Sequence, residues 1–159
     1  EIMRVKGMAK ADKKSDRTAS AGVIQSYTHG EKIGVLVEIN CETDFVARTD
    51  DFKEFARDIA MHIAAENPQF VSVAEIDTEV LKKETDLITK EVEASGKPKE
   101  HVQKIVDGKL KKWHEEVCLM QQTYIKDSDK TVEQLTKEMI GKLGENIIIA
   151  RFSRLELGE

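Results

Sequence analysis

The sequence predicts an α+β fold: a small three-stranded antiparallel sheet packed by helices, with a projecting hairpin of two helices. Two β-branched runs lie close together in the first third of the chain, and a third run lies near the C-terminus. Between them, apolar residues recur at a spacing of about 3.6, which is typical of amphipathic helices. A chain of 159 residues is long enough to bury one ordinary core.

The first two strands are expected at residues 23–28 and 33–39. A short loop containing Gly30 joins them, so they read as a β-hairpin. In the second run, alternation places one apolar set on a single face: Ile33, Val35, Val37 and Ile39. The third strand is expected at residues 147–152, continuing weakly to Leu157, after a turn at residues 144–146.

Helical spacing begins at residue 50 and continues to about residue 65, where Asn67 and Pro68 end the helix. Ser72 followed by Glu75 predicts a capping box. Two further helices are expected to form the helical hairpin at about residues 79–120, with a turn at Ser95 and Gly96 and Pro98 at the first helical position. Thr131 with Gln134 predicts the cap of a last helix, which ends near Leu143.

Hydrophobic residues make up 40% of the chain and charged residues 35%, so a core lies beneath a strongly charged surface. The formal net charge of −5 argues against a uniformly basic nucleic-acid binder. No apolar run approaches the roughly 18–20 residues of a membrane span, so neither a transmembrane helix nor a signal peptide is expected. Cys41 and Cys118 have no CxxC arrangement, which argues against a disulfide scaffold and favours a reducing compartment.

The first 17 residues are expected to stand apart from the core domain, residues 18–159. They hold six basic residues against three acidic ones. A glycine at position 7 would end a helix there, and residues 8–14 would form a short charged linker or helix. Such an arm is interpreted as a solvated tether, and the alternative is an arm that touches RNA or the ribosome.

The sequence carries little of the chemistry that enzymes need. The four histidines are dispersed without metal-ligand spacing, and phosphate-binding glycine motifs are absent from the sequence, so neither metal nor cofactor is expected. Cys41 has no recognisable base partner, and burial as a small apolar residue is the favoured interpretation. On these residues the protein is not an enzyme.

One segment, where the central strand leads into the first long helix, is less ordinary. Thr43 or Asp44 can cap the backbone there and hold Phe45 at a corner on a rigid support. Phe45 can be an ordinary core residue, or it can be an aromatic side chain presented to a partner.

This segment, VLVEINCETDFVAR at residues 35–48, resembles the signature of bacterial and organellar elongation factor Ts. The similarity extends over nearly all of residues 8–159. Further matching motifs follow in the family's order: SYTHG at 26–30, IAMHIAA at 59–65, SGKP at 95–98, VCL at 117–119 and GENI at 144–147.

The resemblance implies a guanine-nucleotide exchange factor that binds elongation factor Tu in its GDP-bound form and promotes release of GDP and Mg²⁺ during translation elongation. It performs no covalent chemistry and carries no cofactor. The family's magnesium-displacing element maps onto Thr43, Asp44, Phe45 and Val46. His62, expected to be half-buried on its helix, is a secondary candidate for contact with the GTPase.

The resemblance also implies a short, single-core form in which only the last residues of the family's N-terminal helical module, about 1–7, are present. Such a form is expected to pair as a two-fold homodimer through the exposed edges of its sheet, with apolar residues such as Phe152. The expected location is the bacterial cytoplasm, or an organellar matrix or stroma. The rival hypothesis is an RNA- or ribosome-binding accessory module that uses the basic N-terminal arm.

Overall fold

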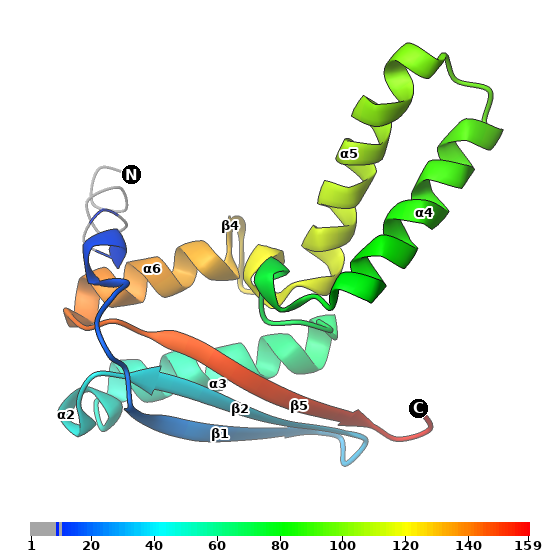
Figure 1. Ribbon diagram of the computed structural model, residues 1–159. Coiled ribbons are helices and arrows are strands. Elements are labelled where there is room, and N and C mark those ends of the chain that lie inside the picture. The colour runs from blue at the N-terminus through cyan, green and yellow to red at the C-terminus, as the bar shows by residue number, and fades with distance from the viewer. Residues whose placement is uncertain (1–8, 10) are drawn as a thin grey trace. The chain divides into compact units, whose positions relative to one another are not determined.

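The computed structural model describes residue 9 and residues 11–159, and Figure 1 shows the course of the chain. It divides into two compact units. The first contains the residues up to Asn67 together with Thr123–Glu159, and the second contains Pro68–Gln122. The predicted helix end at residue 7 lies outside the described residues.

The first unit contains the predicted three-stranded antiparallel sheet. Its strands are β1 (Ala21–His29), β2 (Ile33–Cys41) and β5 (Ile148–Glu156), in the order β1-β2-β5. The α+β prediction and the central position of the second strand are therefore confirmed. Three residues join β1 to β2, and the chain reverses at Gly30 and Glu31, which both have positive φ; the Lys32 amide donates to the His29 carbonyl at 3.1 Å. Positive φ at both central residues gives a turn whose twist matches that of paired strands.

One face of the sheet is buried against α3 (Asp50–Glu66), the long helix that follows β2 (Figure 1). Alternate residues of β2 supply this face and are all buried: Val35, Val37, Ile39 and Cys41. The apolar stripe of α3 meets them with Phe52, Phe55, Ile59 and Ile63. Each such side chain contributes about 1.5–3 kcal/mol when fully buried, so this layer is the core of the unit.

Two short strands and a helix of the first unit follow Gln122 in the chain. A strand pair formed by β3 (Thr123–Tyr124) and β4 (Asp127–Thr131) was not predicted, because the polar run at 127–130 shows no alternation of apolar residues. It leads into α6 (Val132–Leu143), whose capping box between Thr131 and Gln134 is confirmed. Gly144 ends α6 with a φ of 78°, where a residue without a side chain is favoured.

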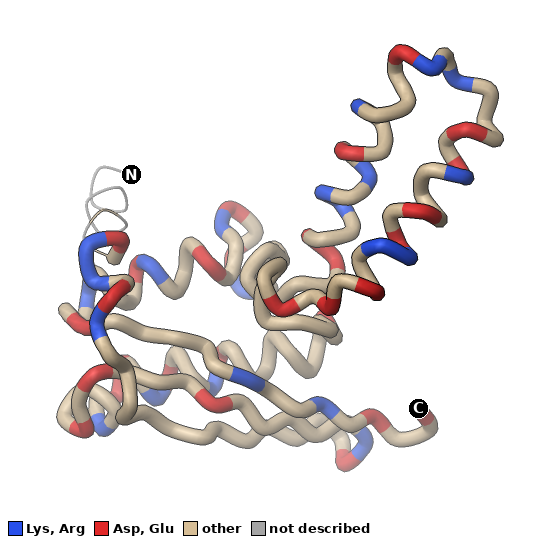
Figure 2. The backbone as a smooth tube through the Cα atoms, viewed as in Figure 1, with Lys and Arg blue, Asp and Glu red and all other residues tan. Residues whose placement is uncertain are grey.

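The second unit contains η1 (Val73–Glu75), α4 (Thr78–Ala94), α5 (Lys99–Val117) and η2 (Leu119–Gln121). α4 and α5 contact each other through a buried cluster, Ile88, Val92 and Val106. A second cluster, Ile76, Val117 and Cys118, lies where α5 ends. Basic and acidic side chains are interspersed along both helices, so neither helix carries charge of one sign only (Figure 2). That this pair projects from the sheet stays a prediction.

Three local predictions in this unit are wrong in detail. The Ser72 side chain makes no cap; instead the Glu75 carboxylate accepts a hydrogen bond from the Val71 amide at 3.2 Å. Pro98 occupies the cap position before α5 rather than its first turn, where its fixed extended backbone serves equally well. α5 ends at Val117, so Met120 lies in η2 rather than in the long helix.

Gly22 offers a test of the β1–β2 pairing. Its φ is 139°, and a Cβ added there would collide with the carbonyl oxygen of Ile39. Gly22→Ala is expected to lower the free energy of unfolding by roughly 2–4 kcal/mol, since backbone strain and overpacking add together. Chemical denaturation measures this. Gly34→Ala is the control, because a Cβ at Gly34 meets nothing within 4 Å and should change stability by no more than about 0.5 kcal/mol. Equal stability of the two variants would contradict the described register.

Candidate functional site

The corner between β2 and α3 is built from α2 (Asp44–Ala47), a single helical turn. Thr43 caps this turn, and its hydroxyl oxygen accepts a hydrogen bond from the Val46 amide at 3.4 Å. Thr49 then caps α3, accepting from the Phe52 amide at 3.2 Å. Of the two caps that the sequence allowed, Thr43 or Asp44, the structure has Thr43. The hydroxyl groups of Thr43 and Thr49 thus bind backbone amides at the two ends of the corner.

Phe45 is 83% exposed, the highest value among the large hydrophobic residues that the structure describes. Thr43 and Asp44 beside it are exposed as well, Val46 is half-buried, and Ala47 is buried at 5% exposure and anchors the turn. This exposure shows that Phe45 is not a core residue, and its presentation to a partner stays a prediction. An apolar ring that stays exposed on a rigid backbone support is typical of an interface anchor.

Two glutamates that the sequence did not single out hold this corner from a distance. The Glu145 carboxylate accepts hydrogen bonds from the amides of Glu42 at 3.1 Å and Thr43 at 3.0 Å, and from the Thr43 hydroxyl at 2.7 Å. In return the Glu42 carboxylate accepts from the Asn146 amide at 3.1 Å. The partners lie more than 100 residues apart in the chain, and no local sequence pattern predicts such a pairing.

The thiol of Cys41 lies beneath the corner and is fully buried, as predicted for a small apolar residue. It donates a hydrogen bond to the Thr43 carbonyl at 3.2 Å. Burial raises the pKa of the Cys41 thiol, and the neighbouring Glu145 carboxylate adds to the effect. A thiol with a raised pKa stays protonated at neutral pH and is a poor nucleophile.

The described part of the N-terminal arm is bound to the same region. The ammonium group of Lys14 donates to the Gly144 carbonyl at 3.1 Å, the Asn146 amide group donates to the Arg17 carbonyl at 2.8 Å, and Arg17 lies 3.7 Å from the Glu42 carboxylate. Ala11 is buried at 2% exposure. Residues 11–17 are therefore attached to the turn and to the corner by polar contacts, although most of their side chains stay exposed. Residues 1–8 and 10 lie outside the described part of the chain.

His62 is fully buried, so the expectation of a half-buried side chain is wrong. Its ring stacks on Tyr124 at a centroid distance of 6.0 Å, and its Nδ1 atom accepts a hydrogen bond from the Ile125 amide at 3.3 Å. One turn earlier on α3, Asp58 pairs with Lys126 at 2.7 Å. Burial raises the pKa of Tyr124, and the Asp58 carboxylate raises it further. His62 therefore ties α3 to the β3–β4 pair and offers a partner no exposed surface.

Among residue 9 and residues 11–159, the structure contains no group of three or more His, Cys, Asp or Glu side chains that could hold a metal ion. No helix in that same part of the chain is both long and apolar enough to cross a membrane.

The state of the cysteines tests whether this protein carries a reactive nucleophile. Burial raises the pKa of both thiols above the ordinary value of 9.0, so each is neutral at pH 8. At pH 8 iodoacetamide is expected to leave Cys41 and Cys118 unmodified in the folded protein and to alkylate both in urea, as mass spectrometry would record. The hydrogen bond from Cys41 should be lost only as the pH rises through the raised pKa. Rapid alkylation of folded Cys41 would instead indicate an activated thiol.

Comparison with known proteins gives one consistent result. The sequence model described as elongation factor TS matches residues 3–159. The chain is 54% identical over 160 residues to elongation factor Ts of Carboxydothermus hydrogenoformans, covering 100% of this chain and 74% of the relative. For Alkaliphilus oremlandii the identity is 48%, again over 100% of this chain and 74% of the relative. For Caldanaerobacter subterraneus it is 50%, with 80% of the relative covered. The chain therefore belongs to the elongation factor Ts family.

Proposed function

We propose that this protein is a guanine-nucleotide exchange factor that binds elongation factor Tu in its GDP-bound form and promotes release of GDP during translation elongation. Membership of the elongation factor Ts family supports the partner and the process. The observation that supports the mechanism is the 83% exposure of Phe45 on a backbone that Thr43 and Ala47 hold in place. The work is done by binding alone, with no covalent step and no cofactor, in the bacterial cytoplasm or an organellar matrix or stroma.

In this mechanism Thr43, Asp44, Phe45 and Val46 form the element that enters the GTPase. A GTPase of this kind holds its nucleotide partly through a Mg²⁺ ion that bridges phosphate oxygens. A wedge that shifts the groups supporting the ion weakens the metal and the nucleotide together. Linkage makes the effect reciprocal, so GDP weakens the binding of this protein by the same factor. A tenfold loosening needs about 1.4 kcal/mol of differential contact, which one aromatic side chain can supply.

His62 enters this proposal only indirectly. Since its side chain is fully buried, a direct contact with the GTPase is not available to it. Its hydrogen bond from Ile125 holds the loop between β3 and β4 on α3, and any contribution to exchange acts through the placement of that loop.

The rival RNA- or ribosome-binding function gains no support from the described part of the arm. Of the basic residues within 11–17, Lys14 and Arg17 are engaged with Gly144 and Glu42, whereas Lys13 is exposed. A basic side chain already paired within its own chain must give up that contact before it can bind a phosphate.

Phe45→Ala is the direct test of the proposed function. Release of a fluorescent GDP analogue from elongation factor Tu is expected to slow at least about tenfold relative to the unsubstituted protein, since a hot-spot side chain contributes roughly 2 kcal/mol or more. The free energy of unfolding should change by less than about 1 kcal/mol, because an exposed ring adds little to the core.

Leu157→Ala is the matched control, since Leu157 is a comparably exposed apolar residue at 77% and lies outside the corner. It should leave the exchange rate unchanged. Wild-type exchange by the Phe45 variant, or an equal loss in both variants, would refute the proposed role of Phe45.

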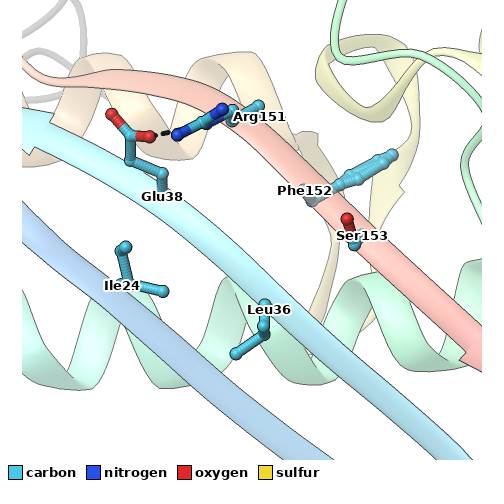
Figure 3. A pocket seen from close by; sticks show the side chains of 6 residues that line it. All are labelled: Ile24, Leu36, Glu38, Arg151, Phe152 and Ser153. Carbon is cyan, nitrogen blue, oxygen red and sulfur yellow. Dashed lines mark hydrogen bonds and ion pairs between the residues drawn. The ribbon is translucent and has the colours of Figure 1, made fainter.

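We also propose that a second copy of this chain covers the outer face of the sheet. This face carries exposed apolar side chains from all three strands: Ile24 at 68%, Leu36 at 53%, Ile148 at 43% and Leu155 at 78%. Figure 3 shows Ile24 and Leu36 together with the ion pair between Glu38 and Arg151, around a depression of about 200 Å³. The Arg151 guanidinium holds the pKa of Glu38 below its usual range.

Phe152 was expected to contribute to this contact, and that stays a prediction. It pairs with Val37, whose side chain is fully buried on the face toward α3, but it is itself only half-buried and also lines this depression (Figure 3). The exposed apolar side chains Ile24, Leu36 and Leu155 lie on the outer face of the sheet, so this face is the surface that we propose a second copy buries.

Sedimentation at tens of micromolar protein, about the range in which pairs of modest affinity assemble, tests this. A dimer is expected that persists in reductant, since Cys41 and Cys118 are both buried. A stable pair should bury near 1,600 Å² in total, and Leu36→Asp should dissociate it. Leu87→Asp, the same change at a residue of α4 that is 54% exposed, should leave the mass unaltered. A monomer under these conditions would reject the proposed pairing.

A further inference from the structure

The corner that carries Phe45 is clasped by a reciprocal exchange of hydrogen bonds. The Glu145 carboxylate accepts hydrogen bonds from the amides of Glu42 and Thr43 and from the Thr43 hydroxyl. The Glu42 carboxylate accepts one from the Asn146 amide. Each carboxylate thus satisfies backbone donors of the other segment. We call the pair Glu42 and Glu145, with the backbone groups they hold, the carboxylate clasp.

The carboxylate clasp binds Thr43, the residue that caps α2. Every polar group of Thr43 is engaged: its amide and hydroxyl donate to Glu145, its hydroxyl oxygen also accepts from Val46, and its carbonyl accepts from the Cys41 thiol and the Ala47 amide. A four-residue helix cannot maintain itself, because nucleation of a single turn is unfavourable. The direction of Phe45, two residues beyond Thr43, therefore depends on external support, and Glu145 supplies it.

One of the two carboxylate charges at the clasp has a cationic partner on the N-terminal arm. Arg17 lies 3.7 Å from the Glu42 carboxylate, and the Asn146 side chain donates to the carbonyls of Arg17 and Ser15 at 2.8 and 3.4 Å. Two neighbouring carboxylates repel each other, and the Arg17 guanidinium and the surrounding amides offset this repulsion. The clasp is consequently a connected network of four hydrogen bonds and one ion pair rather than an isolated surface contact.

Burial of apolar surface does not account for the ordered conformation of the corner. Thr43, Asp44 and Phe45 are all exposed, so ordering them gains little apolar burial and costs conformational entropy. A network that orders an exposed segment lowers the entropy cost that binding would otherwise carry, which is the effect of pre-organisation.

We propose that Glu145 is a positioning residue for nucleotide exchange, acting through Thr43 to fix Phe45 in its binding direction. The inference rests on the proposed exchange function and adds a residue to it. Glu145→Ala removes three hydrogen bonds from the corner. The bimolecular rate of exchange is expected to fall roughly tenfold, since a small misplacement of a positioned group carries losses of up to about 100-fold.

A double-substitution cycle distinguishes positioning from general support. Release of a fluorescent GDP analogue from elongation factor Tu is measured for the unsubstituted protein, Glu145→Ala, Phe45→Ala and the double variant. If Glu145 acts through Phe45, Glu145→Ala should slow exchange in the presence of Phe45 and change it less than about twofold in its absence. Independent, multiplicative losses would overturn the proposal.

Glu145→Gln should retain most of the activity. The Gln carbonyl oxygen can take the position of the Glu145 oxygen that accepts both amides, and only the bond with the Thr43 hydroxyl reverses. If the Gln variant is as slow as the Ala variant, the charge rather than the hydrogen-bond geometry matters, and the positioning role is rejected.

Thr131→Ala is the control for loss of stability, because it removes the capping box of α6 in the same unit without touching the corner. It should leave exchange unchanged at temperatures where the protein stays folded. Equal slowing by Thr131→Ala and Glu145→Ala would mean that Glu145 serves stability only. If the unsubstituted protein fails to accelerate GDP release, the proposed function itself fails. If the unsubstituted protein accelerates GDP release and Glu145→Ala does not slow it, only the positioning role of Glu145 is refuted.

Discussion

Burial of one face of β2 against α3 is the interaction on which the rest of the first unit depends. Alternation in β2 directs Val35, Val37 and Ile39 to the same side, where the stripe of α3 covers them. Since β2 is the central strand, β1 and β5 both take their register from it. A slip of one residue would turn this apolar set toward solvent, so the packing determines the register as well as the stability.

The same geometry creates the corner. A strand and a helix that must pack against each other need a tight reversal between them, and the single turn of α2 accomplishes it. Ala47 faces the core at 5% exposure, whereas Phe45 on the same turn faces solvent at 83%. Stability and recognition are therefore carried by different residues of one short segment. This separation lets an aromatic side chain remain exposed without cost to the core.

The corner also depends on contacts made far along the chain. The turn that ends α6 carries Glu145 and Asn146, and it reaches the corner only because β5 pairs with β2. The described arm joins the same turn through Lys14 and Arg17. Three separate stretches of sequence thus meet at the base of the exposed ring. On the opposite end of α3, His62 plays the comparable part of holding β3–β4.

Most elements of this fold could be predicted from local pattern, because their causes are local. Alternation in residues 33–39, helical spacing after residue 50, and the capping box at Thr131 each arise from neighbours in the chain. The corner residues Thr43 and Phe45 were found in the same way. The β3–β4 pair was not, since its polar strand is held by its partner rather than by an apolar face.

What the tertiary structure alone decided is burial and long-range pairing. An amphipathic pattern does not reveal whether a histidine at the edge of the stripe is half or fully covered, and the β3–β4 pair covers His62 completely. Glu145 has no sequence signal as a partner of Thr43, because a carboxylate more than 100 residues away becomes a neighbour only when β5 docks on β2. Local residues determined where the corner is, and the folded chain determined what holds it.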